Sequence, residues 1–294
     1  MKPPFPDFAP NDEPEDRSRL ESLPPPHIVD DDPDAAKPSQ RSVRLRDIPF
    51  RMLVPSLITL LAICAGLTAV RLSLEGRYEL ALAAIVFAAF LDALDGRVAR
   101  FLKASTSFGE QLDSLADFVN FGVAPALILY SWSLSELFTM GWIVALVFAI
   151  CGCLRLARFN VMLEEPNKPD WAVNFFTGVP APAGALLSLL PIYATLMFNE
   201  GLLLADERKF ISPWLVAAYV LGVGLLMVST IPTLSLKKAG QSIGRAWVLP
   251  VVLAFVLFVV LFFSYPWGML TICSLLYLAV LPYGVWRHRR YAKD

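Results

Sequence analysis

Long apolar runs recur along the chain from about residue 50 to residue 285. A membrane-spanning helix needs roughly 20 consecutive apolar residues, so runs of that length are read as spans. We therefore predict an all-α, polytopic transmembrane bundle with about eight spans. The expected spans lie near residues 52–70, 78–99, 113–133, 139–156, 177–198, 213–231, 246–264 and 267–285. The third is the least regular, because it begins in the polar stretch GEQLDSLADFVNFG.

The overall composition supports a membrane protein. Hydrophobic residues make up 56% of the 294 positions and the mean hydropathy is +0.57, which is more than a soluble domain needs to fill its core. The formal net charge of -1 gives no reason to expect a nucleic-acid partner.

Basic residues predict the orientation, because Lys and Arg accumulate in short cytoplasmic loops. With the N-terminus inside, most of them fall on the inner side and only four fall outside. The four are Arg71, Arg77, Arg208 and Lys209. Both termini are therefore expected in the cytoplasm.

The first forty residues differ in composition from the rest. They are rich in proline and acidic residues and show no apolar periodicity, so we expect a disordered cytoplasmic tail over residues 1–40. A membrane domain is expected over residues 41–285, followed by a basic cytoplasmic C-terminus over residues 286–294.

Four aspartates interrupt the apolar pattern in LDALDGRVARFLKASTSFGEQLDSLAD, residues 91–117. On a helix, two of them share one face with two small residues and an arginine: Asp92, Asp95, Gly96, Ala99 and Arg100. In the next helix, three residues spaced by four form one stripe: Gly109, Asp113 and Asp117. The short polar connection KAST makes the two helices antiparallel neighbours, which brings all four carboxylates to one depth near the inner leaflet.

Four clustered carboxylates cannot all stay ionised unless cations compensate their charge. All-oxygen ligand sets suit hard divalent ions, so we predict two ions of Mg²⁺ or Mn²⁺. The alternative is that the aspartates cap helices or pair with Arg97, Arg100 and Lys103. For the set as a whole we favour the metal site, because ionisable clusters within membrane segments are usually functional.

The aspartate stretch resembles the signature of the CDP-alcohol phosphatidyltransferases at every fixed position. The match reads Asp92-x2-Asp95-Gly96-x2-Ala99-Arg100-x8-Gly109-x3-Asp113-x3-Asp117. The resemblance implies transfer of a phosphatidyl group from a CDP-activated lipid to an alcohol, with release of CMP, at a two-metal site that opens to the cytoplasm. It also implies that the first six spans form the catalytic core, that the enzyme lies in the cytoplasmic (inner) membrane, and that it forms a homodimer.

The resemblance assigns a role to each matched residue. Asp92, Asp95 and Asp113 would hold the metals on the pyrophosphate, while Asp117 would contact a metal and take the proton of the incoming hydroxyl. Gly96, Ala99 and Gly109 would make room for the nucleotide, and Arg100 with Thr106 would bind phosphate oxygens.

The start of the first span, VPSLITLLAI, resembles the Pro-Asn-x-x-Thr entry of the family, with Ser56 in place of asparagine. Ser56 and Thr59 are therefore candidate nucleotide contacts. The alternative is that both bond to carbonyl groups of their own helix.

Three further stretches bear on which alcohol is accepted. SLADFVNFGVAPA, LRLARFN and FTGVPAPAGA resemble the serine-using branch of the family, the integral-membrane phosphatidylserine synthases of bacteria. The expected substrates are then CDP-diacylglycerol and L-serine. Arg155 and Arg158 end a helix at the cytoplasmic face, where a guanidinium could hold the serine carboxylate or simply anchor the helix.

Other functions remain open from the sequence. The same transfer to glycerol 3-phosphate, inositol or choline would use the same signature. A UbiA-like prenyltransferase also uses aspartate-rich helices with Mg²⁺, but it would show a second aspartate-rich motif. A transporter would place its carboxylates near the bilayer midplane rather than at one end.

Overall fold

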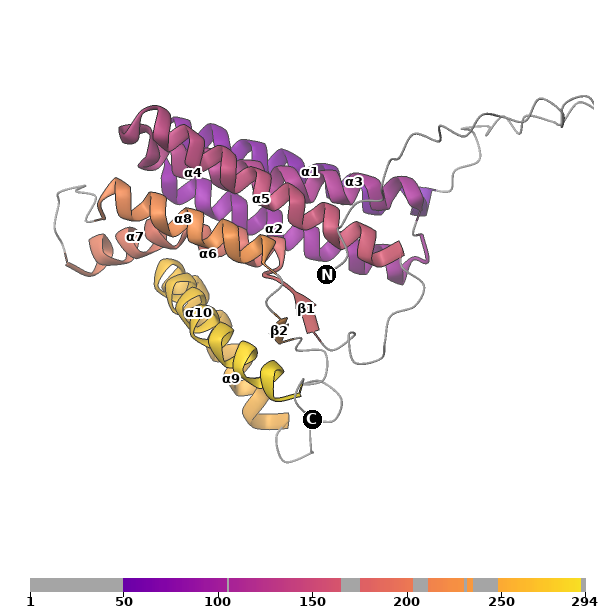
Figure 1. Cartoon of the computed structure of the whole chain (residues 1–294). Coiled ribbons are helices and arrows are strands. Elements are labelled where there is room, and N and C mark those ends of the chain that lie inside the picture. The colour runs from indigo at the N-terminus through magenta and orange to yellow at the C-terminus, as the bar shows by residue number, and fades with distance from the viewer. Residues whose placement is uncertain are drawn as a thin grey trace, which may run out of the picture. The chain divides into compact units, whose positions relative to one another are not determined.

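The computed structural model describes residues 50–104, 106–164, 175–202, 211–229, 232–234 and 248–291. These residues belong to one compact unit, Ile48–Asp294, and they are almost entirely helical (Figure 1). The structure therefore confirms the all-α prediction. The predicted disordered tail, residues 1–40, lies outside the described residues.

The N-terminal half consists of four long helical stretches. A tight turn at Gly76, with φ of 77°, joins the first two helices, and these pack along their length. The third stretch is continuous, because an α-helix, a π-helical segment and a second α-helix follow each other without a break. The elements are α1 (Phe50–Leu74), α2 (Tyr78–Phe101), α3 (Ser107–Asp117), η3 (Phe118–Val123), α4 (Ala124–Trp132), η4 (Leu134–Leu137) and α5 (Thr139–Glu164).

The C-terminal half contains shorter apolar helices and one pair of short strands. In Figure 1, α8 lies beside α5 and α9 pairs with α10. The strands pair antiparallel, with Phe176 opposite Thr233. The elements are β1 (Phe175–Thr177), α6 (Ala181–Ser188), α7 (Leu190–Leu202), α8 (Pro213–Val228), β2 (Pro232–Leu234), α9 (Val248–Ser264) and α10 (Pro266–Tyr291).

Two of the predicted spans need correction. The third begins at Ser107 rather than near residue 113, because the Thr106 hydroxyl caps the helix by accepting a hydrogen bond from the Gly109 amide at 3.0 Å. The fifth, predicted as one helix over residues 177–198, begins as strand β1 and then bends by 41° between α6 and α7. Pro191 explains the bend, since it has no N–H with which to continue the helix.

Smaller differences occur at other boundaries. Helix α5 continues to Glu164 instead of ending near residue 156, and α8 ends at Val228, three residues before its predicted end. The basic C-terminus predicted from residue 286 prolongs α10 as far as Tyr291.

Within the described part of the chain, three helical stretches are long and apolar enough to cross a membrane: Leu53–Leu74, Ser107–Trp132 and Thr139–Met162. The bent pair α6 and α7 makes a fourth if it counts as one span. Helix α2 is not among them, because Glu79, Asp92 and Asp95 interrupt its apolar surface. The membrane bundle agrees with the prediction, while the count of eight spans stays a prediction.

Helix α1 is the element on which the site-bearing helices pack. Thr59, Ala62, Ala69 and Ser73 lie on one stripe of this helix and are all buried, with Gly66 on the same stripe. Such small side chains let neighbouring backbones approach closely, which is how helices associate in lipid. As a result α2, α3, η3 and α4 all contact α1.

Gly141, near the start of α5, tests how tightly the helices are packed. A Cβ atom there would overlap the backbone carbonyl of Leu134, which cannot move aside, whereas a Cβ on Gly222 of α8 would meet nothing within 4 Å. We expect Gly141→Ala to destabilise the protein by about 1–3 kcal/mol. Gly222→Ala is the control and should be neutral or stabilising by up to about 1 kcal/mol. Thermal unfolding in detergent measures both, and an unchanged midpoint for Gly141→Ala would contradict the packing described.

Candidate active site

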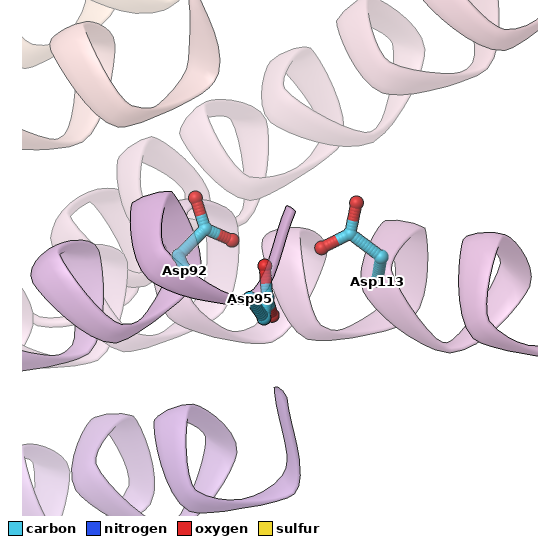
Figure 2. Close-up of side chains that lie close together, drawn as sticks. All are labelled: Asp92, Asp95 and Asp113. Carbon is cyan, nitrogen blue, oxygen red and sulfur yellow. The ribbon is translucent and has the colours of Figure 1, made fainter. Parts of the chain in front are cut away.

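Three carboxylates from two helices converge at one point. Asp92 and Asp95 lie on α2 and Asp113 lies on α3, and Figure 2 shows their side chains directed toward a common centre. One oxygen from each lies within 4.8 Å of the others. This spacing lets a single cation, or two adjacent ones, contact all three groups.

Asp117 adds a fourth carboxyl group to the cluster. It lies at the end of α3, and its carboxyl is close enough to that of Asp92 for the two groups to interact. Its Oδ1 atom is buried and has no hydrogen-bond partner among the described residues. The four aspartates singled out from the sequence therefore form one connected group.

Thr59 of α1 contacts one carboxylate of the cluster. Its Oγ1 lies 2.7 Å from Oδ2 of Asp95 and 3.1 Å from the carbonyl oxygen of Pro55. A hydroxyl has one proton to donate, and the shorter distance favours the bond to the carboxylate. The bond to Pro55 is the alternative predicted from the sequence, the contact with Asp95 is the shorter one, and the nucleotide contact stays a prediction.

A pocket of about 220 Å³ adjoins the carboxylates. The ends of α1 and α2 and the start of α3 form its walls, and Asp95 and Asp113 are part of its lining. All seven residues predicted to contact the nucleotide line this pocket: Ser56, Thr59, Gly96, Ala99, Arg100, Thr106 and Gly109. The structure therefore brings together positions that are more than fifty residues apart in the sequence.

The glycines keep the pocket open. A Cβ atom on Gly96 would meet nothing within 4 Å, so a larger side chain there would extend into open space. A Cβ on Gly109 would lie 3.2 Å from Oγ1 of Thr106. The pocket also receives the N-terminus of α3, whose free amides and dipole favour negatively charged groups.

Sequence reasoning missed three residues of the lining, Pro55, Ala104 and Glu110. Glu110 could have been predicted from the sequence, because it directly follows Gly109 and lies one helical turn before Asp113. Arg100 lines the pocket, and its Nε donates to the carbonyl oxygen of Gly96 at 3.0 Å.

The two arginines predicted as serine contacts occupy different environments. The Arg155 guanidinium interacts electrostatically with Asp117 and lies 5.3 Å from the ring centre of Phe159. Arg158 is exposed and donates to the carbonyl oxygen of Val228 at 3.0 Å, at the end of α8. Of the two, only Arg155 lies beside the carboxylates.

The alternative explanation of the aspartates, as helix caps or ion-pair partners, does not fit the structure. The N-cap positions of α2 and α3 are Arg77 and Thr106. Within the described ranges, no ion pair joins an aspartate of the cluster to Arg97, Arg100 or Lys103. Among the described residues the negative charge therefore has no cation at salt-bridge distance, and a set of oxygen donors this close together fits a divalent metal.

Comparisons with known proteins agree with this geometry. A profile described as CDP-alcohol phosphatidyltransferase matches residues 52–207, and a second, CDP-alcohol phosphatidyltransferase 2, matches residues 246–282. The chain belongs to the CDP-alcohol phosphatidyltransferase family. The first match includes the whole pocket and all four aspartates, so the resemblance carried by the signature is confirmed.

Similar proteins of this family come from several bacteria. A Mycobacterium leprae protein is 38% identical over 251 residues, which cover 85% of this chain and 78% of that protein. A Mycobacterium bovis protein is 46% identical over 180 residues, but the match covers only 61% of this chain and 60% of that protein. A Helicobacter pylori protein is 33% identical over 80% of this chain and 90% of its own length. All three are named CDP-diacylglycerol–serine O-phosphatidyltransferase.

The contact between Thr59 and Asp95 should affect metal binding. Groups that orient a ligand carboxylate typically change metal affinity by about 10–100-fold when removed, so we expect Thr59→Val to weaken Mn²⁺ binding at least about tenfold. Thr68→Val is the matched control, because Thr68 lies on the same helix and donates only to the carbonyl oxygen of Cys64. Mn²⁺ titration followed by electron paramagnetic resonance measures both. Equal affinities for the two variants would show that Thr59 does not support the site.

Proposed function

We propose that the protein transfers the phosphatidyl group of CDP-diacylglycerol to the hydroxyl of L-serine, giving phosphatidylserine and CMP. The observation that carries this proposal is the carboxylate cluster, which borders a pocket lined by all seven residues predicted to contact the nucleotide. The names of the similar proteins support serine as the acceptor.

Asp92, Asp95 and Asp113 are the proposed metal ligands, because their oxygens are the three that meet within 4.8 Å. We propose two divalent cations, Mg²⁺ or Mn²⁺. When bound, such ions polarise phosphoryl oxygens and stabilise the leaving phosphate in a displacement of this kind.

Asp117 is the proposed general base. It lies next to the three proposed ligands, and one of its oxygens is buried and unpartnered among the described residues. In the proposed step the serine oxygen bonds to the phosphorus that carries the diacylglycerol. The bond from that phosphorus to the oxygen shared with the CMP phosphate breaks, the electron pair leaves with CMP, and the serine hydroxyl proton passes to Asp117.

The adjoining pocket is the proposed nucleotide site. Gly96, Ala99 and Gly109 leave space for CMP, while Arg100 and the N-terminus of α3 offer positive charge to its phosphate. Ser56, Thr59 and Thr106 supply hydroxyl groups on the same walls. Binding here would place the pyrophosphate over Asp95 and Asp113, which line the same pocket.

Arg155 is the proposed partner of the serine carboxylate. Its guanidinium already lies close enough to Asp117 for electrostatic interaction, so a small amino acid could reach both groups at once. A guanidinium binds a carboxylate with two parallel hydrogen bonds. Arg158, also predicted as a contact, is instead bonded to the backbone of α8 and is not assigned a substrate role.

Family membership argues against the prenyltransferase and transporter alternatives, since both lack this transfer chemistry. The remaining alternatives are other acceptors, namely glycerol 3-phosphate, inositol and choline. We also propose that the enzyme lies in the cytoplasmic membrane with both termini and the active site facing the cytoplasm, and that it is a homodimer.

The direct test offers purified protein CDP-diacylglycerol with each acceptor in turn and measures CMP release together with the lipid formed. L-serine should drive CMP release with matching phosphatidylserine. If another acceptor drives release and serine does not, the transfer chemistry stands and the choice of acceptor is wrong. No CMP release with any acceptor, in folded protein supplied with Mg²⁺ or Mn²⁺, would contradict the proposed function.

The two arginines provide a matched pair for the acceptor site. Arg155→Ala should raise the KM for serine at least about tenfold and change the KM for CDP-diacylglycerol little, because a lost carboxylate partner weakens only that substrate. Arg158→Ala, three residues away on the same helix, should leave the KM for serine within about twofold of the wild type. Steady-state kinetics of CMP release measures both. A larger effect of Arg158→Ala than of Arg155→Ala would reverse the assignment.

A further inference from the structure

Asn120 is a buried amide for which the described residues offer no partner. It is 0% exposed, and neither its Nδ2 nor its Oδ1 has a hydrogen-bond partner within the part of the chain that the structure describes. Burying an unpartnered carboxamide is unfavourable compared with burying an apolar group of the same size. A chain that only needed to fill this space would be more stable with leucine or valine here.

The position of Asn120 connects it with the site. It lies in the π-helical segment η3, which begins at the residue after Asp117. Segments of π-helix that interrupt α-helices are frequently found at functional sites. Oδ1 of Asp117, three residues earlier on the same stretch, is likewise buried and unpartnered among the described residues. Two side chains with unpartnered polar atoms among the described residues therefore lie about one helical turn apart.

Close packing against α1 confines the Asn120 side chain. A Cβ atom on Gly66 of α1 would overlap Oδ1 of Asn120 and would come within 3.6 Å of its Cα. A Cβ on Gly152 of α5 would lie 3.3 Å from Cα of Gly122, so α5 also packs closely on the backbone of η3. The contact with Gly66 leaves the amide little freedom to turn toward α1.

We propose that Asn120 is a positioning residue for Asp117, whose carboxylate it holds through one buried water molecule in the orientation that accepts the acceptor's proton. A buried water typically makes about three hydrogen bonds to polar groups that lack protein partners. The three unpartnered atoms of Asn120 and Asp117 are an amide donor and two acceptors, a set that one water can satisfy. This inference rests on the proposed role of Asp117 as the base.

The test compares two isosteric substitutions. Asn120→Thr introduces a hydroxyl that can donate a hydrogen bond, whereas Asn120→Val carries a methyl group of the same size in place of that hydroxyl. We expect Asn120→Val to lower kcat at least about tenfold, with KM for both substrates within about twofold and a Tm no lower than that of the wild type. Asn120→Thr should keep kcat within about threefold of the wild-type value. A residue needed only for packing would instead change Tm and leave the Thr and Val variants equally active.

A control variant addresses the effect of removing any buried polar group. Tyr193 of α7 is also 0% exposed, and its hydroxyl has no partner among the described residues. Tyr193→Phe should leave kcat unchanged. Wild-type kcat in Asn120→Val, or an equal loss in the Val and Thr variants, would overturn the inference.

Asp117→Asn separates this inference from the proposed function. If Asp117→Asn is inactive while Asn120→Val turns over normally, only the role of Asn120 is wrong. If Asp117→Asn turns over normally, the assignment of the base fails and the role of Asn120 fails with it. Loss of turnover in both Asp117→Asn and Asn120→Val, with activity in Asn120→Thr, is the result that we expect.

Discussion

Mutual repulsion among four carboxylates is the constraint around which the structure is organised. Asp95 is only 3% exposed, and the described cations leave the cluster without an ion pair. Like charges at this separation and degree of burial strongly disfavour joint ionisation. A divalent cation would remove that penalty, and α2 and α3 hold three of the carboxylates close enough to share one. The cluster is therefore best understood as a site completed by metal.

Helix α1 connects the carboxylate cluster with the rest of the fold through its contacts. Thr59 bonds Asp95 at the end of α1 that lines the pocket, and Gly66, two turns farther along, receives Asn120. The small stripe between these positions allows α2, α3 and η3 to pack directly on α1. Close packing of this kind drives helix association where no hydrophobic effect operates between helices. The same helix thus supports the fold and contacts both Asp95 and Asn120.

Much of this arrangement follows from local sequence patterns. Apolar runs located the helices, and the spacing of Asp92, Asp95, Asp113 and Asp117 placed them on two helix faces before their contacts were visible. The placement of the aspartates depends on positions within one or two turns of each other, where the helical period decides the geometry. The pocket residues came instead from the resemblance to the family signature and, for Ser56 and Thr59, from the resemblance to its entry motif.

The features that could not be predicted depend on contacts between distant segments. Arg155 and Arg158 look equivalent in the sequence, and only the packing of α5 against α8 directs Arg158 to the carbonyl of Val228. The pairing of β1 with β2 joins segments more than fifty residues apart. Asn120 had no distinguishing signal, because its burial against Gly66 becomes apparent only when η3 and α1 are side by side.

The number of divalent ions bound by the aspartates tests the central claim most directly. Mn²⁺ bound per folded chain should be counted in the presence of CMP, in the wild type and in Asp95→Asn and Asp113→Asn. We predict two saturable ions in the wild type and the loss of at least one in each variant, because each substitution removes a carboxylate from a shared ligand set. No saturable Mn²⁺ in the wild type, or an unchanged number of ions in both variants, would contradict the account.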